Sequence, residues 1–255
     1  MHKRTIHRVG LILLLALSAF PALRAQDEKA KPPIYIYVSE WTVPRAQWAE
    51  FIKNDDAENP LMDKLVADGT LIGYGSTVNL IHQEGEPTHS SWMTATSETR
   101  LAKALEAVWA QPEIASPAFA ASKHWDYILV SRNYNGKPGT WKGGYLSGDQ
   151  WNVKPGDMRE YNELVKNNLN PVLDKLVADG TVVSYGFATE DYHTGTLGRV
   201  TFYTMLPDAD ALDKVDKAFD DAFDKMPSYG LAFRSLVDRE GHRDFLERIR
   251  TMTNK

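Results

Sequence analysis

The chain has no cysteine among its 255 residues. This absence excludes disulfide bonds, catalysis by a thiolate and metal sites built on cysteine ligands. It also excludes a lipoprotein, because the lipid of such a protein is attached to a cysteine. An exported protein with this composition has to be stable without cross-links.

Long apolar runs are also scarce, and the one that stands out covers residues 9–20. It is too short to cross a bilayer, which takes about 20 residues. It follows a basic stretch, residues 2–8, and precedes the small residue Ala25, which is the order of a secretory signal peptide. We therefore predict a signal peptide over residues 1–25 and a periplasmic or secreted mature protein; an uncleaved anchor is the alternative. Residues 26–33 are polar and end in prolines, which predicts a flexible leader.

The charge balance limits the partners of the mature chain. Cleavage after Ala25 removes four basic residues and no acidic residue, so the formal net charge moves from −5 to −9. An acidic protein is a poor partner for nucleic acid or for an anionic membrane surface. We therefore expect no nucleic acid and, after cleavage, no membrane as a partner. A small-molecule ligand and a homo-oligomer remain open.

The mature sequence contains two similar halves. Residues 59–75 read NPLMDKLVADGTLIGYG and residues 170–186 read NPVLDKLVADGTVVSYG, with 12 of the 17 positions identical. Chance would give one or two identities, so this match indicates a duplication. Weaker matches align Trp41 with Trp151, His82 with His193, and residues 124–127 with residues 242–245.

Each half shows the same order of predicted elements. Alternating β-branched and aromatic residues predict strands, and apolar residues at helical spacing predict helices. Asn59-Pro60 is a helix-start pair and Gly69 a helix stop. In the first half, residues 34–135, strands are expected at 34–43, 70–82, 89–96 and 124–133, and helices at 45–53, from 59, and at 99–109. In the second half, residues 141–255, strands are expected at 144–153, 181–193, 199–205 and 242–252, and helices at 157–178 and 208–225. The turn-forming sequence NGKPGT, residues 135–140, joins the halves.

Each half therefore reads β-α-β-β-α-β, the order of a ferredoxin-like α+β unit. Two such units in tandem resemble the dimeric α/β-barrel superfamily, in which the two sheets join into a barrel with the helices outside. That superfamily includes cofactor-free monooxygenases and lyases, haem-degrading enzymes, haem-dependent chlorite dismutases and dye peroxidases, and binding or stress proteins. The resemblance rests on order and length, and no family motif matches residue by residue. It therefore implies the fold and leaves the activity open.

Alternation along the first strand of each half separates two faces. One face carries Tyr35, Tyr37, Ser39 and Trp41, and its counterpart carries Tyr145, Ser147, Asp149 and Trp151. The other face of the first strand is aliphatic, with Ile34, Ile36 and Val38. Because the first face is the more polar, we expect it to look into the barrel. Its aromatic side chains would either line a ligand or fill the interior.

Strand order also gathers histidines at one edge of each sheet. In the first half, Trp41, His82 and His124 are expected at this edge of the sheet. In the second half, Trp151, His193 and His242 are expected at the corresponding edge. If the units are related by an axis along the barrel, His82 approaches His242 and His124 approaches His193; a perpendicular axis separates these pairs. The imidazoles would bind a ligand or act as acid and base, or they are relics of the duplication. No HxxxH, HExxH or His-x-His spacing is present, so no metal site is predicted. Glu40, Asp126, Asp149 and Asp244 are further candidates, as bases or as solvated rim residues.

Three hypotheses for function follow. The first is an exported barrel that binds a small apolar or aromatic molecule in its interior, and the second is a cofactor-free oxygenase or lyase, or a haem enzyme. Haem is not favoured, because no axial-ligand motif is present. The third is a non-catalytic scaffold with a filled barrel. The candidate ligand-binding residues are Tyr35, Tyr37, Trp41, His82, His124, Tyr145, Trp151, His193 and His242.

Overall fold

The computed structural model describes residues 31–82, 84–112, 116–192 and 197–255. The expected signal peptide lies outside these residues, as do most of the expected leader and His193. No helix within the described ranges is both long and apolar enough to cross a membrane.

The first half contains the predicted elements and one additional helix. Its elements are β1 (Ile34–Thr42), the 3-10 turn η1 (Arg45–Gln47), α1 (Trp48–Ala57), α2 (Asn59–Ala67), β2 (Gly73–Asn79), β3 (His89–Ala95), α3 (Glu98–Trp109), α4 (Pro117–Ala121) and β4 (Lys123–Gly136). The predicted break at Asn59 is present, since α1 ends at Ala57 and Pro60 cannot continue its hydrogen bonds. Gly69, with φ 80°, adopts the left-handed conformation just after α2.

The second half repeats this order with local differences. Its elements are β5 (Gly139–Trp141), β6 (Tyr145–Val153), α5 (Met158–Leu164), the π-turn η3 (Val165–Leu169), α6 (Asn170–Asp179), β7 (Ser184–Glu190), β8 (Arg199–Leu206), α7 (Asp210–Phe223), α8 (Tyr229–Leu236) and β9 (Val237–Asn254). The single helix expected over residues 157–178 is therefore interrupted by a π-turn. The sequence pattern did not predict β5, α4 or α8.

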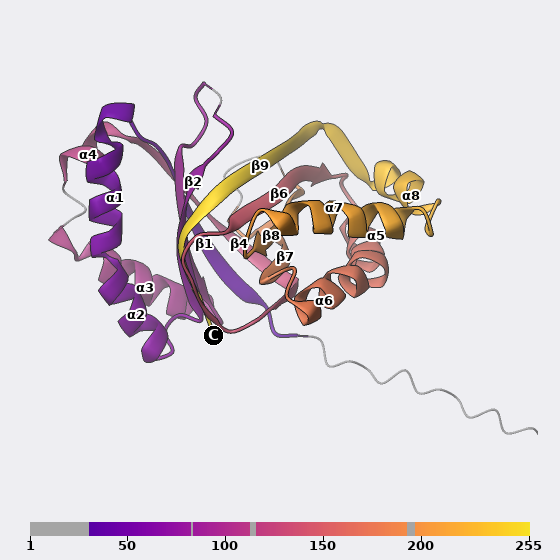
Figure 1. The fold of residues 1–255 in the computed structure, drawn as a ribbon, viewed down its shortest axis with the longest axis horizontal. Coiled ribbons are helices and arrows are strands. Elements are labelled where there is room, and N and C mark those ends of the chain that lie inside the picture. The colour runs from indigo at the N-terminus through magenta and orange to yellow at the C-terminus, as the bar shows by residue number, and fades with distance from the viewer. Residues whose placement is uncertain (1–30, 83, 113–115, 193–196) are drawn as a thin grey trace, which may run out of the picture. The chain divides into compact units, whose positions relative to one another are not determined.

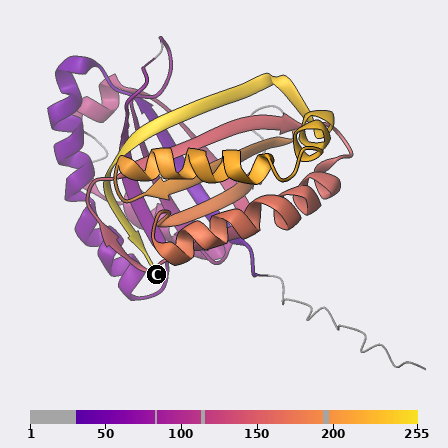
Figure 2. The ribbon, with the colours of Figure 1, turned by 45° about the vertical axis from the view of Figure 1, so that its right-hand side comes forward.

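The strands form one closed, antiparallel barrel. Their order is β2-β3-β1-β4-β7-β8-β6-β9, with β2 paired to β9 to complete the ring and β5 added at the end of β9. Each half has the ferredoxin-like order, so the predicted fold class is confirmed. The seams are β4–β7 and β2–β9, where the second strand of one half borders the fourth strand of the other. This is the arrangement expected for an axis along the barrel. Figures 1 and 2 show α1–α4 outside one side of the barrel and α5–α8 outside the other.

The hydrophobic core has layers inside and outside this ring. Aliphatic residues such as Ile34, Ile36 and Ile249 pack inside the barrel. Outside it, the first-half helices cover a layer that includes Tyr37 and Met62. The second-half helices cover a third layer, which is built largely from aromatic side chains.

The expected orientation of the strand faces is therefore wrong. Tyr37 packs under α2, and Trp41 contacts Phe51 of α1 and Phe119 of α4. The other aromatic residues of these faces, Tyr35, Tyr145 and Trp151, also pack in the layers beneath the helices. In a barrel covered by helices both faces of a strand are buried, so polarity alone does not tell which face is inside.

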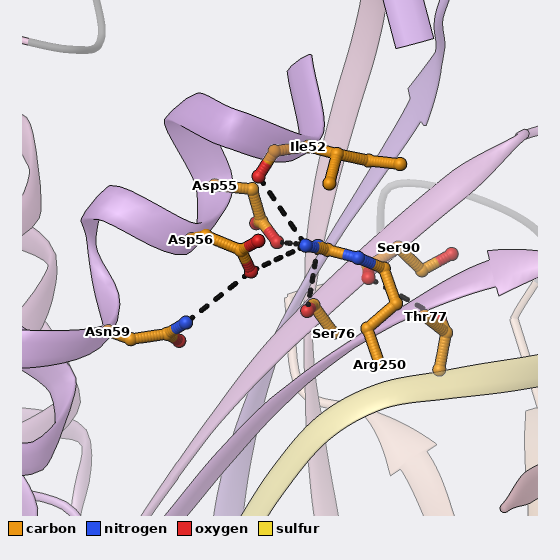
Figure 3. Close-up of polar contacts among 8 residues, drawn as sticks. All are labelled: Ile52, Asp55, Asp56, Asn59, Ser76, Thr77, Ser90 and Arg250. Atoms are coloured by element: carbon orange, nitrogen blue, oxygen red, sulfur yellow. Dashed lines mark hydrogen bonds and ion pairs between the residues drawn. The ribbon is translucent and has the colours of Figure 1, made fainter. Parts of the chain in front are cut away.

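An ion-pair cluster ties the closing seam to the helices (Figure 3). Arg250 of β9 pairs with Asp55 of α1 and lies 2.5 Å from Asp56, and it also donates to Ser76 Oγ of β2 at 3.2 Å. The side chains of Arg250 and Asp55 are only 15% and 17% exposed. Removing one partner of such a buried pair leaves the other charge uncompensated.

We predict that Arg250→Ala lowers the free energy of unfolding by roughly 3 kcal/mol, because it leaves the buried Asp55 carboxylate without its counter-ion. Arg248→Ala is the matched control, because Arg248 lies on the same strand and is exposed; it should stay within about 0.5 kcal/mol of the wild type. Urea denaturation of the three proteins measures the difference. Equal stability of the two variants would show that the cluster does not hold the seam.

Candidate functional site

The interior of the barrel is hollow. It encloses a cavity of about 370 Å³, here called the barrel cavity, to which all eight strands of the ring contribute. Its apolar walls are formed by Ile34, Ile36, Val38, Ile72, Trp92, Leu129, Leu146, Met205, Phe245 and Met252. The scaffold hypothesis requires a barrel whose interior is filled by side chains, and this interior is not filled.

One end of the barrel cavity is acidic. Glu247 is 5% exposed and accepts a hydrogen bond from Thr77 Oγ1, while Glu40 accepts one from Trp125 Nε1 at 2.7 Å. Burial, together with the nearby Glu40, raises the pKa of Glu247 to about 7. Burial also raises the pKa of Glu40, although Arg243 opposes this shift. Glu247 can therefore hold a proton near neutral pH.

The sequence analysis identified Glu40 as a candidate base or rim residue and missed its partners. Glu40 lies inside the barrel, where its hydrogen-bonding neighbours include Tyr127. Burial raises the pKa of Tyr127 well above its ordinary value, so this hydroxyl stays protonated. The sequence marks Glu247 only as the single acidic residue within the strand residues FLERI. A register shift in the β2–β9 pairing makes it hard to tell from the sequence which side chains of this strand point inward.

A second cavity, of about 310 Å³, lies between the first-half sheet and its helices, and we call it the helix–sheet cavity. Its apolar lining includes Met62, Tyr74, Met93, Leu105, Val108, Trp109 and Phe119. Its polar lining includes Ser39 and His124. The ring of Trp41 stacks on that of His124 with centroids 3.7 Å apart, so these two predicted site residues do meet.

A small polar network lies beside the helix–sheet cavity. His124 Nε2 is 2.8 Å from Ser39 Oγ and 2.6 Å from Asp126 Oδ1, and Trp41 Nε1 donates to Ser39 Oγ at 2.8 Å. Two oxygen atoms so close to one nitrogen favour the tautomer or charge state in which Nε2 carries hydrogen. Tyr37 also bonds to Asp126, and burial raises the pKa of Tyr37. The network could accept or return a proton, but both oxygens contact the same nitrogen, so it lacks the relay geometry of a Ser-His-Asp triad.

The second histidine expected at this edge, His82, lies a little apart from His124. His82 is exposed, and its ring centroid is 5.6 Å from that of Trp48. The sequence analysis missed His89, which is 2% exposed and packs edge-on against Trp48 at 5.0 Å. Burial lowers the pKa of His89 to about 4, so it is neutral at physiological pH. His89 is thus part of the core rather than an acid–base group.

The second half places His242 beside two carboxylates. His242 Nε2 is 3.0 Å from Asp244 Oδ1 and 3.8 Å from Asp149 Oδ1, and one ligand atom from each residue fits within 4.8 Å. Burial and Asp244 raise the pKa of Asp149 to about 7, because two facing carboxyls favour sharing a proton. The three could coordinate a cation, although no metal site was predicted, but each side chain is more than one-third exposed.

Of the remaining predicted site residues, two lie in the layer beneath the second-half helices, and His193 lies outside the described residues. Trp151 packs on Tyr161 and Phe233 beneath the second-half helices, and Tyr145 borders the same layer. His193 lies outside the described residues, so its expected approach to His124 stays a prediction. His242 contacts Asp149 and Asp244, and its expected approach to His82 likewise stays a prediction.

Comparisons with known proteins show the fold. The chain matches no protein-family profile and no curated protein. Among solved structures it is similar to a candidate monooxygenase from Lactobacillus acidophilus, with 11% identity, 88% of this chain and 97% of that chain covered, and a TM-score of 0.60. An anthrone oxidase-like protein shares 12% identity over 88% and 94% of the two chains, with a TM-score of 0.51. A candidate chlorite dismutase shares 14% over 86% and 95%, with a TM-score of 0.50. The chain therefore has the fold of the dimeric α/β-barrel superfamily.

The resemblance to this superfamily suggests haem as a cofactor. The residues that line the helix–sheet cavity show whether haem could be ligated there. Among the described residues lining this cavity, only His124 carries an imidazole. Its Nε2 contacts Ser39 and Asp126, and its ring lies flat against Trp41. An axial ligand needs a nitrogen lone pair directed at the iron. His124 Nε2 is therefore not available as an axial ligand to haem in this cavity.

We predict that Glu247 makes the fold less stable as pH rises. Its folded pKa of about 7 exceeds the value near 4.5 expected on unfolding, so its contribution is complete below about pH 4.5 and is lost as pH rises through about 7. Between about pH 5 and pH 8 this loss should be on the order of 2 kcal/mol.

Glu247→Gln keeps a neutral hydrogen-bonding group and should show a flatter dependence of stability on pH. Glu50→Gln, an exposed change on α1, is the control and should follow the wild type. Denaturant titrations at several pH values supply the comparison. Parallel curves for wild type and Glu247→Gln would contradict a protonated buried Glu247.

Proposed function

We propose that this α/β barrel binds a small apolar or aromatic molecule in the barrel cavity. The observation that carries the proposal is the open interior of about 370 Å³, whose aliphatic and aromatic walls also carry polar groups, among them Glu40, Gln150 and Thr201. Ligand sites in proteins are typically concave, mostly apolar and about 300–1,000 Å³ in volume. A single chain supplies all the strands that enclose this volume.

We also propose that the protein acts outside the cytoplasm. The support is the predicted signal peptide over residues 1–25 and the absence of cysteine, which leaves no thiol to oxidise there. A ligand met in that compartment would be an extracellular or periplasmic small molecule. Its binding does not require a second copy of the chain, although self-association remains compatible with the proposal.

The barrel cavity can be tested by filling it. Leu146→Trp adds an indole to the cavity wall and should weaken binding of the uncharged probe N-phenyl-1-naphthylamine at least tenfold. Leu231→Trp adds the same indole on an exposed side chain of α8, 72% exposed, and should leave binding unchanged. Fluorescence titration gives the affinities, and thermal melting checks that both variants are folded. Equal binding by both variants would place the probe elsewhere and overturn the proposal.

A second candidate function is supported by the helix–sheet cavity. The proton-accepting network of Tyr37, His124 and Asp126 adjoins an aromatic cavity there. Structures with the same fold are named as a monooxygenase and as anthrone oxidase-like. In a cofactor-free oxygenase the protein's part is to bind the substrate, exclude water and remove a proton. We propose His124, whose Nε2–H is held by Asp126, as the group that would accept this proton at Nδ1 from a phenol- or anthrone-type substrate.

We predict that His124→Ala reduces any oxygen consumption with anthrone by about 100-fold or more, the usual effect of losing a general base. His82→Ala is the matched control, because His82 is exposed on the same side of the molecule and does not line the cavity. An oxygen electrode measures both rates. Wild-type protein without activity, or a fully active His124→Ala variant, would reject the oxygenase candidate while leaving the barrel cavity untested by this experiment.

A further inference from the structure

The barrel cavity has ends of opposite charge. Glu40 and Glu247 lie at one end, and Lys31 and Lys255 line the other. Ile34 and Glu40 both line the cavity from β1 and are six residues apart, so the ends are separated by about 20 Å. An elongated ligand therefore meets a directional field along the barrel.

The acidic end has more carboxylates than cations. Among the described lining residues there, Arg243 is the only cation, and its guanidinium lies 2.5 Å from the carboxylate of Glu86. The charge of Arg243 also acts to lower the pKa of Glu40 and of Glu247, so three carboxylates share this one cation. Burying more carboxylates than cations is unfavourable, and the proton that Glu247 can hold near neutral pH partly relieves this cost.

An unused polar atom lies at the same end. Ser90 is 7% exposed and lines the cavity, and its Oγ has no hydrogen-bond partner among the described residues. Thr77 Oγ1 donates to the Ser90 carbonyl oxygen and to Glu247, and it does not bond to the Ser90 hydroxyl. A buried hydroxyl without a partner is unfavourable, and a ligand that bonds to it would recover this cost.

We propose that the ligand of the barrel cavity is an amine, whose positively charged head lies between Glu40 and Glu247 and whose apolar body follows the aliphatic walls. This inference rests on the proposed function, because it names the ligand class of that same cavity. The ammonium group supplies a second cation beside Arg243, and its N–H groups can donate to the carboxylates and to Ser90 Oγ. The two glutamates disfavour an anionic head.

The proposal implies a pH dependence. The groups facing Glu247 are Glu40 of β1, Thr77 of β2, Tyr127 of β4 and Arg243 of β9. An ammonium ion replaces the proton held by these carboxyls, while the amine itself stays charged to about pH 10. Amine binding should therefore strengthen as pH rises from about 5.5 to about 8.

The test compares three probes with the same tail: octylamine, 1-octanol and octanoate. Isothermal titration at about pH 8 should show octylamine binding about tenfold or more tighter than octanol, because charge-assisted hydrogen bonds are roughly twice as strong as neutral ones. Octanoate should bind weakest. Glu40→Gln/Glu247→Gln should lose the preference for the amine while still binding octanol, which also shows that its cavity is intact. Glu190→Gln is the control, because Glu190 is buried but pairs with Arg199 outside the cavity lining.

The outcomes separate the head group from the cavity. Equal affinity of wild type for octylamine and octanol would overturn the amine inference and leave interior binding in place. Failure of all three probes to bind would overturn both. An amine preference that persists in the double glutamine variant would show attraction to the acidic protein as a whole, and would also overturn the inference.

Discussion

Closure of the sheet is the constraint on which the rest of this structure depends. Each ferredoxin-like half would end in unpaired strand edges and an uncovered sheet face, and pairing β2 with β9 and β4 with β7 removes both. The same closure turns two aliphatic faces into the walls of one cavity. Arg250 joins this seam to α1 through Asp55 and Asp56, so the barrel and its helical cover are fixed together.

The sequence was sufficient for the fold because local patterns and the match between residues 59–75 and 170–186 gave the same order of elements twice. It was not sufficient for the orientation of β1. Alternation shows that Tyr37 and Ile36 lie on opposite faces, but both faces are buried in the finished barrel. The more polar face lies under the helices because α1, α2 and α4 provide the partners for Tyr37 and Trp41. Glu247 was missed for a related reason, since an acid in a strand ordinarily faces water.

The two halves use equivalent strand positions for different chemistry. Ser39 faces Asp126 across β1 and β4, whereas Asp149 faces Asp244 across β6 and β9. The first pair adjoins the open helix–sheet cavity, while the corresponding second-half layer is packed with aromatic residues such as Trp151. This asymmetry makes the first half the better candidate for acid–base chemistry. The barrel cavity, in contrast, belongs to both halves, and its acidic end combines Glu40 from one with Glu247 from the other.

The central claim is that barrel closure creates a binding site inside the ring. A crystal structure of the protein grown with octylamine tests it most directly, because it locates the bound molecule. The account predicts electron density for the amine inside the barrel, with its nitrogen within hydrogen-bond distance of Glu40 or Glu247 and its tail against Ile36 and Leu129. Density confined to the helix–sheet cavity, or a barrel interior empty at saturating octylamine, would contradict it.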